Sequence, residues 1–250
     1  MWRRIFKFSG LLVVIVFLII TLAFTSHESR NIICRNIEVD FRADDIIKIN
    51  NSEILKLVKS ADDSIVGKTL GKINAEFIEQ EVEKHKAVLK AEVYKVLVKD
   101  STSYKGILTV KVKHRKPVVR IVSENGNYYL DKFGGRIPVS NQYTANVLAA
   151  TGNISEKFAV EELLPFILYL KEDEFWEAQI EQIHLENNGD VLLIPLVGDQ
   201  IIELGKLENY ETKLRNMRAF YNQVLAANNC WDKYKSVSLK YSNQIVAKKR

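Results

Sequence analysis

The sequence predicts an α+β protein built of an N-terminal transmembrane helix, a β-α-α-β-β domain and a C-terminal mixed α/β domain with a mainly antiparallel sheet. Three observations lead to this fold class. Residues 10–24 form one apolar run, two amphipathic helices follow an alternating strand, and beyond Pro117 the chain changes to short strands with tight turns. We therefore expect a cytoplasmic tip, a transmembrane helix, a first domain and a second domain at residues 1–7, 8–25, 32–117 and 118–250.

The apolar run is long enough to span a membrane. Extended back through Phe6 and Phe8, it reaches about 20 residues, the length that a helix needs to cross the hydrocarbon core. Basic residues precede it, and these keep the N-terminus in the cytoplasm: Arg3, Arg4 and Lys7. The alternative is a cleaved signal peptide, although its apolar region is usually only about 7–15 residues long. In both cases the chain from Ser26 onward lies outside the cytoplasm.

The composition is that of an ordinary folded protein. The chain has 250 residues, of which 47% are hydrophobic and 27% charged, and its formal net charge is +5. The basic residues do not gather on one helix face with interleaved aromatic residues, which argues against nucleic-acid binding. Cys34 and Cys230 fall in different predicted domains, so we expect no disulfide between them.

The first domain is predicted to be a small sheet covered by two helices. Residues 37–41 alternate between apolar and polar side chains, as a half-buried strand does. Asn74 is the expected N-cap of the second helix, which turns three apolar side chains inward: Phe77, Ile78 and Val82. A strand hairpin follows, with in-phase apolar residues on each strand: Tyr94, Val96 and Val98, then Leu108, Val110 and Val112.

The second domain is predicted from turn signals. Pro117 marks the boundary, and Asn125-Gly126 is typical of a hairpin turn. We expect short strands at residues 128–131, 136–138, 179–185, 191–194 and 200–204. One helix contains Leu163, Leu164, Ile167 and Leu170, with Pro165 in its first turn or at a kink. The most regular helix spans 208–226, with an inward stripe of Tyr210, Leu214, Met217, Tyr221 and Val224.

The chain is predicted to end on one strand, residues 236–246. In this segment Val237, Leu239 and Tyr241 alternate with polar residues.

No pattern in the sequence indicates catalysis. Gly67-Lys68-Thr69 looks like the end of a P-loop, but Asp62 occupies the position of the first glycine and a helix precedes the segment. The four histidines are scattered over different elements: His27, His85, His114 and His184. Asp131, beside a glycine turn, is expected to cap backbone amides. We therefore expect no catalytic residue, no cofactor and no metal.

Several local patterns occur in order along the chain. They are Gly67-Lys-Thr-Leu70 with Ile73-Asn74, Val110-Lys-Val-Lys-His-Arg-Lys-Pro-Val118, Tyr128-Tyr-Leu-Asp131 with Gly134-Gly135, Leu148-Ala-Ala-Thr-Gly152, and Val237-Ser-Leu-Lys-Tyr241. Together they resemble the FtsQ/DivIB family of bacterial cell-division proteins. The sequence departs from the family pattern at Asn74, where Asp is usual, at His114, where an acid is common, and at Ala149, where Pro is usual.

The resemblance implies a single-pass, non-enzymatic scaffold of the division machinery in the inner membrane, located at mid-cell during division. Residues 32–117 would form a POTRA domain and residues 118–250 a β domain. The implied partners are FtsB/DivIC-like and FtsL-like membrane proteins, bound by strand addition at the C-terminal strand. The implied partner-binding residues are Leu239, Lys240, Tyr241, Ser242, Gln244 and Val246. The alternative for Tyr241 is a core position in a fully paired strand.

Two other functions stay open. A POTRA-containing periplasmic adaptor for outer-membrane protein assembly or secretion usually has tandem POTRA units or a barrel, whereas this sequence shows one unit. An exported hydrolase would need a cleft with perturbed titratable groups. A basic ribbon of Lys111, Lys113, Arg115 and Lys116 fits an acidic partner or lipid headgroups, and equally a solvated strand face.

Overall fold

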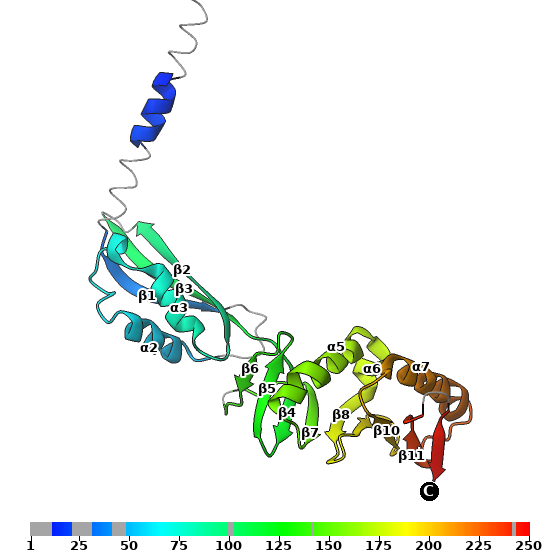
Figure 1. The fold of residues 1–250 in the computed structure, drawn as a ribbon. Coiled ribbons are helices and arrows are strands. Elements are labelled where there is room, and N and C mark those ends of the chain that lie inside the picture. Colours follow the sequence, from blue (N-terminus) through cyan, green and yellow to red (C-terminus); the bar gives the residue numbers. More distant parts are fainter. Residues whose placement is uncertain (1–11, 22–31, 42–48, 100–102, 142, 242–243) are drawn as a thin grey trace, which may run out of the picture. The chain divides into compact units, whose positions relative to one another are not determined.

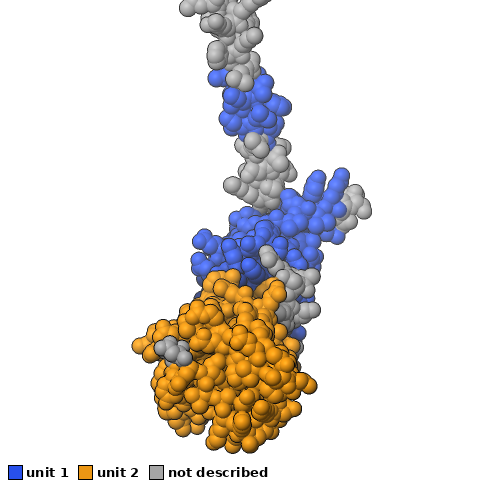
Figure 2. Space-filling model, turned by 90° about the vertical axis from the view of Figure 1, so that its right-hand side faces the viewer, with its two compact units in different colours: residues 1–114 blue, residues 115–250 orange. Residues whose placement is uncertain are grey.

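The computed structural model describes residues 12–21, 32–41, 49–99, 103–141, 143–241 and 244–250. Contacts within the chain divide it into two compact units, residues 1–114 and 115–250, which Figure 2 colours separately. The division follows His114, close to the expected boundary at Pro117.

Residues 12–21 form a helix whose apolar side chains are exposed. The remainder of the predicted span at residues 8–25, and the whole predicted tip at residues 1–7, lie outside the described residues. Among the helices that the structure describes, none has both the length and the apolar character needed to cross a bilayer.

Unit 1 is a three-stranded sheet with two helices on one face (Figure 1). Its elements are β1 (Cys34–Phe41), α2 (Asn51–Ala61), a 3-10 turn (Leu70–Lys72), α3 (Ala75–Glu83), β2 (Val88–Lys99) and β3 (Tyr104–His114). Strand β3 lies in the middle, parallel to β1 and antiparallel to β2. This is the predicted β-α-α-β-β arrangement.

The core of unit 1 lies between the helices and the sheet. Leu108, Val110 and Val112 are fully buried on β3, as predicted. Asn74 caps α3, because its side chain accepts a hydrogen bond from the Phe77 amide at 3.1 Å.

One expectation for unit 1 needs correction. Phe77 is 44% exposed. The buried face of α3 is formed by Ile78 and Val82, one turn apart, and Phe77 lies at the margin of that face. The in-phase side chains of β2 are also exposed: Tyr94, Val96 and Val98. They point away from the helices, whereas Ala91 and Val93 face the core.

Unit 2 is a nine-stranded mixed sheet in the order β12-β11-β10-β9-β8-β7-β4-β5-β6. The strands are β4 (Pro117–Ser123), β5 (Gly126–Asp131), β6 (Arg136–Pro138), β7 (Leu148–Gly152), β8 (Ile180–Leu185), β9 (Val191–Pro195), β10 (Ile201–Gly205), β11 (Tyr234–Ser238) and β12 (Val246–Lys249). The pairs β4–β7, β7–β8 and β10–β11 are parallel, and the other neighbours are antiparallel.

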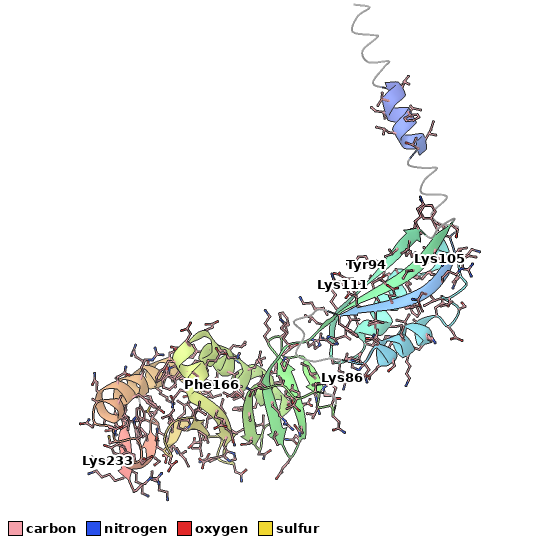
Figure 3. All side chains as sticks on the ribbon, turned by 180° about the vertical axis from the view of Figure 1, so that it is seen from behind. Lys86, Tyr94, Lys105, Lys111, Phe166 and Lys233 are labelled. Atoms are coloured by element: carbon pink, nitrogen blue, oxygen red, sulfur yellow. The ribbon has the colours of Figure 1, made fainter. Side chains whose placement is uncertain are left out.

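The helices of unit 2 cover one face of this sheet (Figure 1). They are α4 (Glu156–Phe158), α5 (Leu164–Glu172), α6 (Glu174–Gln179) and α7 (Tyr210–Phe220), with π-helical segments at Ala159–Leu163 and Tyr221–Ala226. Phe166 of α5, labelled in Figure 3, is fully buried in the core between helices and sheet.

The π-helical segments explain two features of the helices. Pro165 lies in the first turn of α5, directly after the wide π turn, which tolerates the missing proline N–H. The second segment rotates the end of the long helix. Leu225 is therefore buried where the regular spacing predicted Val224.

The predicted terminal strand at residues 236–246 is wrong as a single element. Strand β11 ends at Ser238 and β12 begins at Val246. Strand β11 is internal, because β10 pairs with one side and β12 with the other. Strand β12 therefore runs back along β11 and forms one border of the sheet, with β6 at the other.

Candidate functional site

Strand β12 forms one border of the C-terminal sheet. It pairs antiparallel with β11, with Val246 opposite Ser238 and Lys248 opposite Ser236. Among the described residues, no strand pairs with the opposite side of β12. An edge strand of this kind presents unpaired backbone N–H and C=O groups, which another extended chain can use.

The side chains of β12 are mostly exposed. Val246 is 48% exposed, and Lys248 and Lys249 face solvent. Ala247 is partly buried against the core of unit 2. The strand therefore offers its backbone together with one apolar and two basic side chains.

A hollow of about 340 Å³ borders β12. Ile201 of β10, Ser236 of β11 and Lys248 of β12 line it and lie in one cross-strand row. The next row, Ile202 and Val237, is fully buried in the core that includes α7. The hollow is thus on the face away from the helices, with the small Ser236 side chain between two larger ones.

Ion pairs join both ends of the β11–β12 hairpin to the rest of the sheet. Lys240, the second residue after β11, places Nζ 2.8 Å from Oδ2 of Asp190 in the β8–β9 connection. Arg250, directly after β12, binds Oδ2 of Asp199 in the β9–β10 connection at 2.9 Å. The Lys240 hydrogen bond holds the pKa of Asp190 below its ordinary value.

The predicted partner-binding residues fall on three different features. Leu239 is 1% exposed and belongs to the core, Lys240 is the ion-pair partner of Asp190, and Val246 opens β12. Tyr241 is 62% exposed, so it is not a core residue, and Gln244 is exposed. Ser242 lies outside the described residues. The structure thus brings Tyr241 and Val246 to the surface and does not bring Leu239 there.

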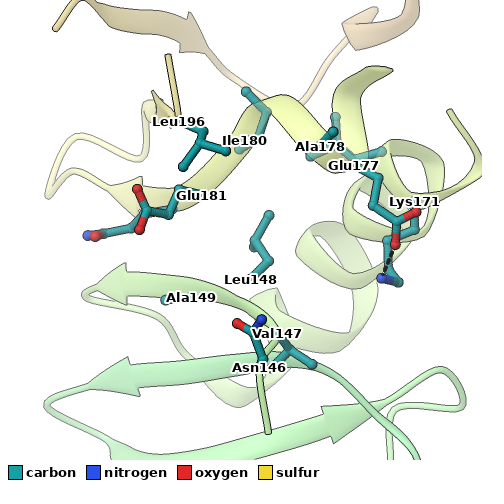
Figure 4. Close-up of a pocket in the computed structure, with 12 residues that line it drawn as sticks. Asn146, Val147, Leu148, Ala149, Lys171, Glu177, Ala178, Ile180, Glu181 and Leu196 are labelled. Carbon is teal, nitrogen blue, oxygen red and sulfur yellow. Dashed lines mark hydrogen bonds and ion pairs between the residues drawn. The ribbon is translucent and has the colours of Figure 1, made fainter. Parts of the chain in front are cut away.

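A second hollow, of about 500 Å³, lies where β7 and β8 begin (Figure 4). Leu148, Leu170 and Ile180 give it apolar walls, and Lys171 and Glu177 pair across one side at 2.5 Å. The charged side chains on this side of the hollow thus neutralise each other in an ion pair.

The predicted basic ribbon spans residues of both units. Arg115 donates to Asp131 inside unit 2. Lys111 and Lys113 line a hollow of about 90 Å³ with Lys90 and Glu92 on the unit 1 sheet, where Figure 3 labels Lys111. The ribbon is therefore divided between the two units.

The titratable residues singled out in the sequence have structural partners. Asp62, which replaces the P-loop glycine, pairs with Lys68 at 2.6 Å. His184 Nδ1 lies 2.9 Å from Thr151 Oγ1, and His114 Nε2 accepts the Ile49 amide at 3.3 Å. Within the described ranges, no group of acidic, His and Cys side chains has the arrangement of a metal site.

Comparison with known families decides the class of protein. Residues 116–248, more than half of the chain, match the family described as FtsQ/DivIB, C-terminal related. The chain belongs to this family. Residues 30–102 of this FtsQ/DivIB-related protein match the POTRA-like domain. No curated protein matches the chain. Members of these families are non-catalytic scaffolds, and the C-terminal domain indicates protein partners.

Sequence reasoning missed Ala247, Lys248, Asp190 and Asp199 as parts of the edge. The segment Val246–Lys249 is too short and too basic to stand out as a strand by its own pattern. The two aspartates lie in hairpin turns, where Asp is common for local reasons. No signal in the sequence alone connects these turns with the last residues of the chain.

Proposed function

We propose that this FtsQ/DivIB-related protein is a scaffold of the bacterial division machinery that recruits an FtsB/DivIC-like partner, which arrives with an FtsL-like protein. The partner adds an extended segment to β12. The observation that supports this most directly is the border strand of the family-matched unit, whose outer side pairs with no described strand.

The chemistry of the edge favours strand addition over a helix-in-groove mode. Backbone groups of β12 supply affinity, and the hollow at Ile201, Ser236 and Lys248 supplies selectivity for one side chain of the added segment. Tyr241, exposed three residues after the end of β11, adds a large surface with one polar tip. The protein acts without catalysis and without a cofactor.

The proposal includes the location of the protein. Residues 8–25 anchor it once in the inner membrane, with the N-terminus in the cytoplasm and both folded units in the periplasm. The apolar run and the basic residues before it support this orientation.

Depletion in growing cells tests the cellular role. We expect filaments or failed septa, and a tagged copy at mid-cell. Evenly dispersed membrane label together with normal septation would contradict the proposal. Normal division with a defect in outer-membrane protein assembly would instead favour the POTRA adaptor.

Co-purification of the FtsB/DivIC-like protein tests the interface. Tyr241→Asp should abolish recruitment because it places a charge beside the edge, whereas it leaves the fold intact at an exposed position. Tyr104→Asp is the matched control, since Tyr104 is 58% exposed in unit 1. If the partner still co-purifies with the Tyr241 variant, the interface is misplaced.

A further inference from the structure

Strand β12 has few contacts of its own that hold it in the sheet. It has four residues, and Ala247 is the one whose side chain reaches the core. Short terminal strands fray unless other contacts tie them down. A partner that binds a frayed strand must first order it, which weakens the apparent affinity. The contacts that fix the chain before β12 therefore bear on partner binding.

Two consecutive residues fix the chain as it leaves β11. The Leu239 amide donates to the Glu203 carbonyl at 2.8 Å, and the Leu239 side chain is buried. Lys240 then extends over Gly205 to Asp190. Beyond Lys240, the Gln244 amide donates to the Tyr241 carbonyl at 3.4 Å, and Ile245 packs against the core directly before β12. Asp190 thus supplies the ion pair that holds the chain just after β11.

Asp190 is itself held in place. Its side chain is 16% exposed, and its amide donates to Oδ1 of Asn188 at 2.8 Å. Lys206, just after β10, lies 3.5 Å from Oδ1 of the same carboxylate. An ion pair with a partly buried, preordered carboxylate contributes more than one between two mobile surface side chains.

We infer that Asp190 is a positioning residue for the partner-binding edge: through its ion pair with Lys240, it fixes the chain where it leaves β11 and so helps to hold β12 ready for strand addition. This inference rests on the proposed function of β12. Asp190 itself lies in the β8–β9 connection and acts on the partner through Lys240 and β12.

The competing explanation is that Asp190 only stabilises its own β8–β9 hairpin. Variants of the two lysines distinguish the explanations, because Lys240 connects Asp190 to the chain after β11, whereas Lys206 connects it to the chain after β10. Lys240→Ala should reproduce the effect of Asp190→Asn, and Lys206→Ala should not. Asp232→Asn, at an exposed position before β11, is the matched control for the loss of a carboxylate.

Hydrogen–deuterium exchange of the full-length chain, without partner, measures the order of residues 244–250. We expect Asp190→Asn and Lys240→Ala to raise their exchange rate on the order of fivefold. Lys206→Ala and Asp232→Asn should exchange like the wild type. The charge-exchanged pair Asp190→Lys with Lys240→Asp should restore slow exchange. Wild-type exchange in Asp190→Asn, or equal effects of the two lysine variants, would overturn the inference.

Binding of the FtsB/DivIC-like protein to the same variants supplies the second measurement. Asp190→Asn and Lys240→Ala should raise Kd on the order of fivefold, and the controls should not. If all variants bind like the wild type, the inference fails and the proposed function stands. If the wild type itself does not bind, the proposed function fails, and the exchange rates alone decide whether Asp190 positions β12.

Discussion

Arg115 donates a hydrogen bond to Oδ2 of Asp131 at 2.7 Å, and the Asp131 side chain is only 3% exposed. The other carboxylate oxygen accepts the amides of Phe133 at 2.9 Å and Gly135 at 2.7 Å. One buried carboxylate thus closes the turn between β5 and β6 and binds the first residue of unit 2.

Asp131→Ala should destabilise unit 2 by about 2–4 kcal/mol, because it leaves two amides and a guanidinium without their acceptor. Denaturant unfolding monitored by tryptophan fluorescence measures this, since Trp176 and Trp231 both lie in unit 2. Glu124→Ala, at an exposed position, is the control. Equal unfolding midpoints for the two variants would show that the Asp131 contacts contribute nothing net.

Gly152→Ala should be far more damaging than Gly67→Ala. Both glycines have positive φ, +107° and +98°, so both substitutions strain the backbone by about 1–2 kcal/mol. A Cβ at Gly152 would also overlap the Leu185 carbonyl oxygen of β8, whereas a Cβ at Gly67 has no atom within 4 Å. Thermal unfolding should show a much larger fall in Tm for Gly152→Ala than for Gly67→Ala. Similar Tm shifts for the two variants would contradict this.

Leu239→Ala should mainly lower the stability of unit 2, whereas Tyr241→Ala should mainly weaken partner binding. Leu239 is buried, and its truncation should cost about 2–4 kcal/mol of unit 2 stability. Tyr241 is 62% exposed, so its truncation should leave stability within about 0.5 kcal/mol and weaken partner binding. Denaturant unfolding and co-purification measure the two effects. If the Leu239 variant is stable and fails to bind the partner, Leu239 is part of the interface and the prediction is wrong.

The Asp190 ion pairs should make unit 2 sensitive to acid. The hydrogen bond from Lys240 lowers the pKa of Asp190 from 3.8. The ionised form therefore stabilises the folded state at pH above the unfolded pKa, and this stabilisation is lost as pH falls through the folded pKa. Asp190→Asn should lose less stability than the wild type between about pH 6 and about pH 3. Parallel curves for the two proteins would contradict the assignment.

Local chemistry explains which parts of the fold were predictable. The Asn74 cap, the glycine turns and the alternation of β3 depend on neighbours in sequence, and the structure confirms them. Strand β7 was not predicted as a strand, because Leu-Ala-Ala-Thr-Gly has little β preference. Its two parallel neighbours, β4 and β8, make it a strand.

The sequence predicts which region of the chain forms the candidate site. It does not predict that two strands, β11 and β12, make up that region. The alternation of Val237, Leu239 and Tyr241 continues the strand pattern past Ser238, so the sequence predicts one long strand. What ends the strand is contact with residues far away in sequence, Glu203 and Asp190. Such tertiary contacts leave no trace in a local pattern, so the sequence gives no sign that Leu239 is buried or that Lys248 lies on the border strand.

The order in which the chain passes through the sheet has a consequence for assembly in the cell. Strand β11 reaches its position beside β10 only after the chain has passed through α7, and β12 pairs only with β11 among the described strands. The border strand is therefore among the last elements to be completed. A partner segment that pairs with β12 therefore needs a copy in which β11 and β12 have already joined the sheet.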